Sequence, residues 1–345
     1  MEGGMQVSGT GHTLRMVAWE LTRNCNLNCV HCRAAASKGP HEGELTLSEC
    51  RRVMDEIAGF ASPTIILTGG EPLLRDDIFD IIDYGNGKGL RLVMAINGTL
   101  LTEEKAQRLK DGGIKRISLS LDGKDARTHD AFRGVNGSFN SVMRAGNILK
   151  DVYLPFQINT TITRLNVDDL LDIYILAKSI GAVAWHVFLL VPVGRGKDLK
   201  GKELDTEAYE NVLSWLYGIE SKNEIELKVT CAPHYYRIVK EKGDNPKSAG
   251  CLAGKSFMFI SHKGIAQPCG YLEIASGDVR AQGVKRVWEE SLIFNQLRDL
   301  SSYKGKCGTC RYLKICGGCR ARAYEFHGDY LHEEPYCSYN HSVDE

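Results

Sequence analysis

Three cysteines near the start of the chain have a spacing suited to a metal cluster. Cys25, Cys29 and Cys32 provide three thiols within eight residues, directly after a predicted strand. Zinc sites usually have four ligands in paired spacing, which this trio lacks. Three thiolates on a four-iron cluster leave one iron open, and that iron can chelate the amino and carboxylate groups of a methionine sulfonium. The trio therefore indicates an iron–sulfur centre that passes an electron to such a sulfonium.

A second group of cysteines lies in the last third of the chain. Its seven members are Cys251, Cys269, Cys307, Cys310, Cys316, Cys319 and Cys337. The four central ones form two C-x2-C pairs, which are typical of a zinc ribbon. Only five residues separate the pairs, whereas a zinc ribbon usually has a spacer of about 12 or more. Seven cysteines also exceed the needs of one zinc ion, so iron–sulfur clusters are the main interpretation and a zinc ribbon is the alternative.

The bulk composition is that of a globular protein without a strong net field. The chain has 345 residues, is 43% hydrophobic, and carries 43 basic and 43 acidic side chains. This balance gives no reason to expect binding to nucleic acid or to an anionic membrane. No apolar run approaches the roughly 18 residues that span a bilayer, and residues 1–15 lack the apolar core of a signal peptide. We expect a cytoplasmic protein, whose twelve cysteines favour metal binding over disulfides.

Short β-rich segments alternate with amphipathic segments between about residues 16 and 229. The predicted strands are 17–21, 64–68, 92–96, 116–121, 156–162, 184–190 and 226–230. The predicted helices are 46–58, 77–88, 102–112, 138–150, 167–180 and 206–221. This alternation predicts an α/β protein with a parallel sheet covered by helices, either open or closed into a barrel. In such barrels, functional residues gather at the carboxyl ends of the strands, where the motifs of this chain also fall.

The composition changes after about Lys242. Glycine and cysteine become dense, helices are expected to be scarce, and residues 257–261 and 265–269 predict a hairpin. The run 307–337 has little apolar periodicity, so it needs metal clusters to hold it together. We predict an N-terminal tail at 1–13, a catalytic domain at 14–242 and a small Cys-rich domain at 243–345.

Two motifs of the first domain resemble the radical SAM superfamily: the cysteine trio and the segment Thr68-Gly69-Gly70-Glu71-Pro72. The resemblance covers residues 14–240 and implies a partial (β/α)6 TIM-like barrel that binds a [4Fe–4S] cluster and S-adenosylmethionine (SAM). Gly69 and Gly70 would let the backbone approach SAM closely, and Glu71 would accept a hydrogen bond from its ammonium group. Further SAM contacts implied by the resemblance are Asn97, Ser118, Ser120, Asp122, Thr161 and Arg164.

The cysteines of the tail resemble the SPASM extension of radical SAM enzymes that act on peptides or large substrates. The resemblance implies one auxiliary [4Fe–4S] cluster on Cys307, Cys310, Cys316 and Cys337. It implies a second on Cys251, Cys269 and Cys319, with either an open iron or an additional ligand such as Cys231. The x2 spacing between Cys316 and Cys319 departs from the commoner x3 of the family. Cys50 lies in a helical pattern and is expected to be a small buried residue.

Several strings resemble the branch of this superfamily that trims porphyrin side chains in the siroheme-dependent heme pathway. Those at 185–192 and 231–236 look most like the heme synthases. This resemblance implies an oxidoreductase that uses a 5′-deoxyadenosyl radical to decarboxylate two propionates of iron-coproporphyrin III to vinyl groups, giving heme b. It also implies an electron donor such as ferredoxin or flavodoxin.

A flat macrocycle with four carboxylates needs cationic or hydrogen-bonding partners. The candidates are Arg133, Arg195, Lys228, His186, His234 and His262, each of which could instead be a structural or surface residue. Three other functions stay open: a deacetylase of didecarboxysiroheme, a SPASM maturase that modifies a peptide, and a non-enzymatic iron–sulfur sensor or zinc scaffold.

Overall fold

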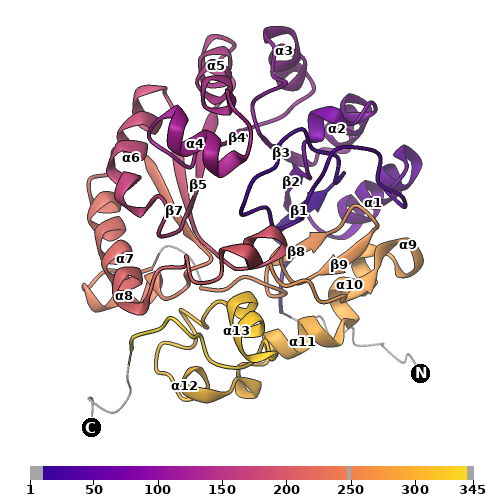
Figure 1. The fold of residues 1–345 in the computed structure, drawn as a ribbon. Coiled ribbons are helices and arrows are strands. Elements are labelled where there is room, and N and C mark those ends of the chain that lie inside the picture. Colours follow the sequence, from indigo (N-terminus) through magenta and orange to yellow (C-terminus); the bar gives the residue numbers. More distant parts are fainter. Residues whose placement is uncertain (1–10, 247–249, 340–345) are drawn as a thin grey trace, which may run out of the picture.

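One sheet of ten strands runs through the chain in this computed structural model, which describes residues 11–246 and 250–339 (Figure 1). Its order is β10-β9-β8-β1-β2-β3-β4-β5-β6-β7. The first seven strands are β1 (Met16–Glu20), β2 (Thr64–Thr68), β3 (Arg91–Ile96), β4 (Ile117–Ser120), β5 (Phe156–Ile162), β6 (Ala184–Leu189) and β7 (Glu226–Thr230). They are parallel and lie side by side in chain order, as the β–α alternation predicts.

Helices ring the outside of this curved sheet (Figure 1). They are α1 (Leu47–Phe60), α2 (Ile78–Gly87), α3 (Glu103–Asp111), α4 (Ala126–Arg133), α5 (Ser138–Asp151), α6 (Leu170–Ser179), α7 (Thr206–Ser221) and α8 (Tyr235–Glu241). The six predicted helices are present with ends shifted by a few residues. Helices α4 and α8 were not predicted, because eight and seven residues are too few to show a helical period.

Alternation along strand β5 separates an apolar outer face from a polar inner face. In β5, Ile158 and Ile162 are buried in the main core under the helices. Gln157, Asn159 and Thr161 point to the opposite side, toward the barrel interior. Strand β5 therefore offers polar groups to the barrel interior, while its apolar side chains join the main core.

The C-terminal segment continues the same sheet. The predicted hairpin is confirmed as β8 (Phe257–Ile260) and β9 (Ile265–Gln267), followed by β10 (Gly277–Asp278). Strand β8 pairs with β1 in parallel, so that Met16 lies opposite both Thr64 of β2 and Phe257 of β8. The domain limits at 13/14 and 242/243 stay predictions.

The expectation that helices would be scarce after residue 242 is wrong. Within residues 250–339 five short α-helices follow: α9 (Val279–Gln282), α10 (Val284–Glu290), α11 (Leu292–Arg298), α12 (Gly305–Gly308) and α13 (Arg320–His327). Each has eight residues or fewer, which hides its periodicity in the sequence. Figure 1 places α12 and α13, in yellow, beside the barrel.

Each helix within residues 11–246 and 250–339 is too short or too polar to cross a lipid bilayer.

Candidate active site

A cavity of about 190 Å³ lies at the carboxyl ends of the central strands. All three cysteines of the N-terminal trio line it, as do five of the nine residues predicted to contact SAM: Gly69, Gly70, Asn97, Ser120 and Thr161. The predicted substrate residue Arg195 and the candidate Arg133 also line it. Tyr271, from the segment after β9, forms part of the wall. The motifs at the ends of successive strands thus meet at one rim of the barrel.

Backbone and arginine contacts fix the cysteine loop. The Cys25 N–H donates to the Ser37 carbonyl over 3.0 Å, which closes the loop on itself. Arg195, in the short helix η3 (Gly194–Leu199), donates from Nε to the Cys29 carbonyl (2.9 Å) and from Nη1 to the Ala36 carbonyl (2.7 Å). Two of its three guanidinium nitrogens therefore hold the loop.

The thiols of the trio suit a cationic iron cluster. Burial raises the pKa of Cys25 to about 11, and it also raises the pKa of Cys29. Such thiols ionise only beside a strong positive charge, which cluster irons would supply. Arg133 at the end of α4 donates from Nη1 to the Cys29 sulfur at 3.6 Å and adds to this charge. Among the described residues no three metal-binding side chains lie close enough together to hold a single metal ion. A four-iron cluster has a different requirement, because each thiolate binds a different iron.

The two glycines after β2 are packed against the segment that leads into the cysteine loop. A Cβ on Gly69 would lie 2.5 Å from the Thr22 carbonyl oxygen, and one on Gly70 would lie 2.3 Å from that of Asn24. The Gly70 N–H donates to the Thr22 carbonyl over 2.7 Å. The glycines therefore allow the approach of the chain's own backbone, in addition to lining the cavity.

Glu71 does not line the cavity, although the resemblance of its motif to the radical SAM superfamily implied a contact with the SAM ammonium group. Its side chain is fully buried, and its two carboxylate oxygens accept from the Leu73 N–H (3.1 Å) and the Asn97 N–H (2.7 Å). Burial raises the pKa of Glu71 to about 7, against the effect of these two hydrogen bonds. The structure thus places Glu71 behind Asn97, where it positions the end of β3.

Asp122, Ser118 and Arg164 also lie outside the wall of the cavity. Asp122 is fully buried, forms an ion pair with Arg133 and accepts from the Thr161 N–H over 2.7 Å. Ser118 is buried two residues before Ser120 on β4. Arg164 faces outward, where it pairs with Asp205 at 2.9 Å. Asp122 therefore does not contact the cavity itself but holds two residues that line it, Arg133 and Thr161.

The three predicted substrate histidines lie in three different places. His186 on β6 is hydrogen-bonded to Gln157 at 2.9 Å, two residues before the cavity-lining Phe188. His262 pairs with Glu20 at 2.8 Å. His234 lies in the pocket of the auxiliary cysteines described below. None of the three lines the cavity at the trio.

A buried carboxylate that the sequence analysis did not single out anchors this region. Glu20, the last residue of β1, is fully buried and forms ion pairs with Arg23 and Arg33, each at 3.0 Å. Burial opposes its ionisation, but the hydrogen bond from His262 and the two guanidinium charges lower the pKa of Glu20 to about 2. Glu20 thereby connects β1, the cysteine loop and the β8–β9 hairpin. The only signal in the sequence was its position near the end of the predicted strand 17–21.

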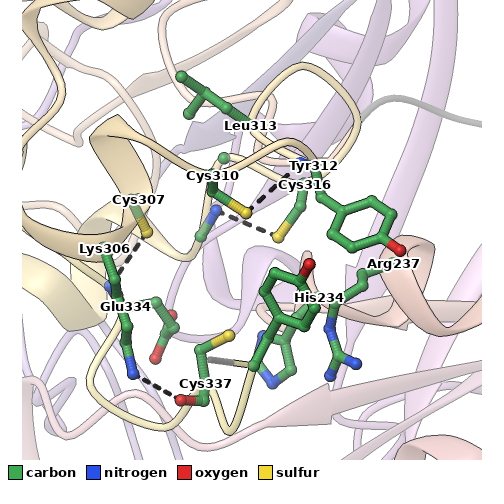
Figure 2. Close-up of a pocket in the computed structure, with 13 residues that line it drawn as sticks. His234, Arg237, Lys306, Cys307, Cys310, Tyr312, Leu313, Cys316, Glu334 and Cys337 are labelled. Atoms are coloured by element: carbon green, nitrogen blue, oxygen red, sulfur yellow. Dashed lines mark hydrogen bonds between the residues drawn. The ribbon is translucent and has the colours of Figure 1, made fainter. Parts of the chain in front are cut away.

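The first auxiliary group of cysteines surrounds one pocket (Figure 2). Its wall contains the four cysteines predicted to act together: Cys307, Cys310, Cys316 and Cys337. Burial raises the pKa of Cys337 to about 11 and that of Cys316 further. His234 projects into this pocket from the barrel side, with its ring stacked on Tyr209 at 4.7 Å between centroids.

The second auxiliary group contains Cys231 together with the three remaining tail cysteines. Burial raises the pKa of Cys231, and charge on Cys319, Cys269 and Cys251 would raise it further. Cys231 and Cys269 also pack against the same apolar cluster that contains the buried Cys319. Cys231 directly follows β7 and has a left-handed backbone with φ of 61°. The barrel thus contributes a fourth thiol to the set that lacked one. Cys50 is buried in α1, as expected.

The contact at Gly70 gives a first prediction. In Gly70→Ala the new Cβ collides with the backbone carbonyls of Asn24 and Arg23, at 2.3 and 2.8 Å, and must displace the segment that carries Cys25. We expect the affinity for SAM, measured by equilibrium dialysis on the reconstituted protein, to fall by about tenfold or more.

The matched control is Gly87→Ala in α2, where no atom lies within 4 Å of the position that the new Cβ would take. This variant should bind SAM like the parent. Equal affinities of the two alanine variants would contradict the role given to Gly70.

The raised pKa of Glu71 gives a second prediction. A carboxyl whose pKa rises from 4.5 to about 7 on folding stabilises the fold below about pH 4.5 and loses this contribution as the pH passes 7. The apoprotein should therefore lose up to about 3 kcal/mol of stability between about pH 5 and pH 8 from this group. Glu71→Gln mimics the neutral acid and should show a smaller loss in thermal or urea unfolding.

Glu104→Gln, which removes an exposed carboxylate at the start of α3, is the control. It should follow the parent across the pH range. If Glu71→Gln loses as much stability between pH 5 and pH 8 as the parent does, then ionisation of the buried Glu71 is not the cause of that loss and the prediction is wrong.

Comparison with known proteins agrees with this geometry. A model of the radical SAM superfamily matches residues 19–177, and a model of the SPASM iron–sulfur cluster-binding domain matches residues 251–320. These two domains imply that the chain binds [4Fe–4S] clusters. The fold is similar to that of SuiB from Streptococcus suis bound to SAM, with a TM-score of 0.77 and 17% identity, over 95% of this chain and 78% of SuiB.

Two relatives are similar along nearly the whole chain. The AdoMet-dependent heme synthase of Nitratidesulfovibrio vulgaris is 48% identical over 95% of this chain and 93% of the relative. The protein of the same name from Methanosarcina barkeri is 47% identical over 94% of this chain and 96% of the relative. The chain therefore belongs to the AdoMet-dependent heme synthase family of the radical SAM superfamily.

Proposed function

We propose that this protein is a heme synthase that converts two propionates of iron-coproporphyrin III into vinyl groups, giving heme b. The observation that carries the proposal is the cavity at the strand ends, where the cysteine trio, the SAM-type motif residues and arginines meet in a chain 48% identical to a heme synthase. Each conversion removes one carbon dioxide, one hydrogen atom from the propionate β-carbon and one electron.

In this proposal Cys25, Cys29 and Cys32 hold the catalytic [4Fe–4S] cluster, and SAM binds beside it in the cavity. When bound, the two cofactors together supply the oxidant that removes the hydrogen atom. Gly69, Gly70, Ser120 and Thr161 line the space for SAM. Asn97 also lines it, with its Nδ2 donating to Asn26 of the cysteine loop over 2.8 Å.

Two arginines in the cavity retain donors for a substrate carboxylate. Arg195 uses Nε and Nη1 to hold the cysteine loop, and Arg33 uses Nη1 on Glu20. Within the described residues the Nη2 atoms of both have no hydrogen bond, and both side chains line the cavity. We assign these atoms to a propionate, since a guanidinium suits a carboxylate. Arg133 is instead held by Asp122 and Cys29.

The two auxiliary cysteine groups provide a destination for the electron that leaves the substrate. The proposal gives each group one [4Fe–4S] cluster: Cys307, Cys310, Cys316 and Cys337 hold the first, and Cys231, Cys251, Cys269 and Cys319 hold the second. Buried thiols with raised pKa values again suit a cationic cluster. Tyr271 lies close to Cys269 in sequence and reaches the wall of the catalytic cavity, so the second group is near the substrate. A ferredoxin or flavodoxin would deliver electrons to the catalytic cluster.

Anaerobic turnover tests the proposal. The reconstituted protein with SAM, a low-potential reductant and iron-coproporphyrin III should yield two successive products, each lighter by one carbon dioxide and two hydrogens counted on the neutral acid. Cys25→Ala should form neither product, because it removes a ligand of the catalytic cluster. Cys50→Ala, a buried cysteine outside all three groups, should keep activity within about twofold.

Unchanged porphyrin beside rapid SAM cleavage would contradict the heme synthase assignment and favour a peptide or another tetrapyrrole as the substrate. A protein that does not cleave SAM at all would instead favour the non-enzymatic sensor or scaffold.

A further inference from the structure

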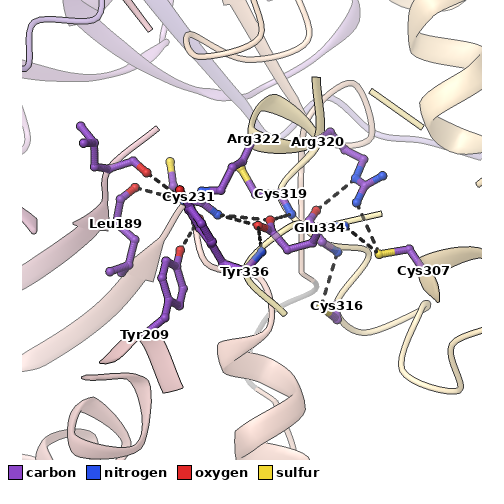
Figure 3. A network of polar contacts seen from close by, with 12 residues as sticks. Leu189, Tyr209, Cys231, Cys307, Cys316, Cys319, Arg320, Arg322, Glu334 and Tyr336 are labelled. Carbon is purple, nitrogen blue, oxygen red and sulfur yellow. Dashed lines mark hydrogen bonds and ion pairs between the residues drawn. The ribbon is translucent and has the colours of Figure 1, made fainter. Parts of the chain in front are cut away.

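Helix α13 carries two arginines, Arg320 and Arg322, whose side chains are fully buried. A buried guanidinium is costly unless hydrogen bonds and opposite charge compensate it. The partners of the two arginines therefore indicate what each of them stabilises. Figure 3 shows that both belong to one polar network and that they reach toward different cysteines.

Arg320 contacts the first auxiliary group. Its Nη2 donates to the Cys307 sulfur at 3.7 Å, and its Nη1 donates to the carbonyls of Tyr330 (3.1 Å) and His332 (2.5 Å). The Glu334 N–H also donates to the Cys307 sulfur, at 3.4 Å. This sulfur thus receives one hydrogen bond from a cation and one from the backbone.

Arg322 contacts the second auxiliary group through the backbone. Its Nη2 donates to the Cys231 carbonyl at 2.9 Å and to the Leu190 carbonyl at 3.1 Å. Its Nη1 pairs with Glu334 at 3.1 Å. The Glu334 carboxylate also accepts from the Cys319 N–H at 2.8 Å, so this pair touches two of the four cysteines of the group.

Cys231 needs such support because its φ of 61° is unfavourable for a residue with a side chain. The Tyr209 hydroxyl makes a longer bond of 3.3 Å to the same carbonyl, and the Tyr209 ring lies 5.2 Å from the Arg322 guanidinium carbon. Arg322 thus joins the strand ends of the barrel to the tail at the residue where the barrel supplies its thiol.

We propose that Arg320 and Arg322 are positioning residues that serve one auxiliary cluster each, a role that rests on the cysteine assignments of the proposed function. Arg320 sets the potential of the first cluster, because a cationic donor to a thiolate stabilises the more negative, reduced state. Arg322 keeps Cys231 in place as the fourth ligand of the second cluster, with Glu334 neutralising its charge.

The test compares Arg320→Met, Arg322→Lys and Cys231→Ala in the reconstituted full chain, with Arg286→Met as a control at an exposed salt bridge. The readouts are iron and sulfide per chain and EPR-monitored redox titration. Arg320→Met should keep its iron. The first cluster is recognised in the titration as the one that Cys231→Ala leaves unchanged. Its midpoint potential should become more negative by about 59 mV in Arg320→Met, which is a tenfold change in the reduced-to-oxidised ratio.

Arg322→Lys keeps the charge but loses the planar fork that reaches both Glu334 and the Cys231 carbonyl. It should behave like Cys231→Ala: on oxidation the second cluster loses its unsupported iron and gives a three-iron EPR signal, while the first cluster keeps its potential. Because Arg322→Lys could misfold, the double variant Arg322→Met/Glu334→Gln removes both buried charges and retains an acceptor for the Cys319 N–H. It should give the same signal. Arg286→Met should match the parent.

If both Arg322 variants have the iron content and spectra of the parent while Cys231→Ala gives the three-iron signal, the role of Arg322 is overturned and the cysteine assignment stands. An unshifted midpoint in Arg320→Met would overturn the role of Arg320. A parent-like Cys231→Ala would overturn the cysteine assignment and this inference with it.

Discussion

Strand β1 is paired along both of its edges, and the relative positions of the cysteine trio, Cys251 and Cys269 depend on this pairing. Met16 lies opposite Thr64 of β2 on one side and Phe257 of β8 on the other. The chain leaves β1 directly into the loop of Cys25, while Cys251 precedes β8 and Cys269 follows β9. A slip of one residue in either register would turn each side chain of β1 to the other face. The two registers therefore fix the cysteine trio, Cys251 and Cys269 relative to the same strand.

Buried charges complete the connections between these segments. Glu20 joins the cysteine loop to His262 of the β8–β9 turn, Asp122 joins Arg133 to β5, and Glu334 joins Arg322 to the Cys319 backbone. A buried ion pair adds little net stability, but losing one partner leaves an uncompensated charge and is costly. Such pairs therefore tolerate few alternative arrangements. This suits a protein that must hold sulfur ligands from distant parts of the chain at fixed separations.

Strand periodicity was sufficient to predict the parallel sheet, and cysteine spacing was sufficient to predict a metal-binding trio, because both are local signals. The closure of the sheet into a barrel and the grouping of the tail cysteines were implied by the resemblance to the radical SAM and SPASM families. The roles of Glu71 and Asp122 were not predictable in this way. Both follow strands and resemble ligand-binding residues, but their actual partners are the backbone of Asn97 and the Arg133 guanidinium. Likewise, Glu20 and His262 are 242 residues apart, and nothing in either neighbourhood indicates the pairing. The sequence left an open iron and Cys231 as alternatives for the second tail set, and the proposal of Cys231 depends on its packing with Cys319 and Cys269 in space.

We propose that one chain holds three four-iron clusters: one on the trio, one on four tail cysteines, and one on three tail cysteines together with Cys231 of the barrel. Native mass spectrometry of the anaerobically reconstituted parent tests it most directly, because it counts iron and sulfide on intact molecules. We expect a dominant species with about twelve irons and twelve sulfides per chain. A fully reconstituted protein that stops at about four or eight irons would contradict it.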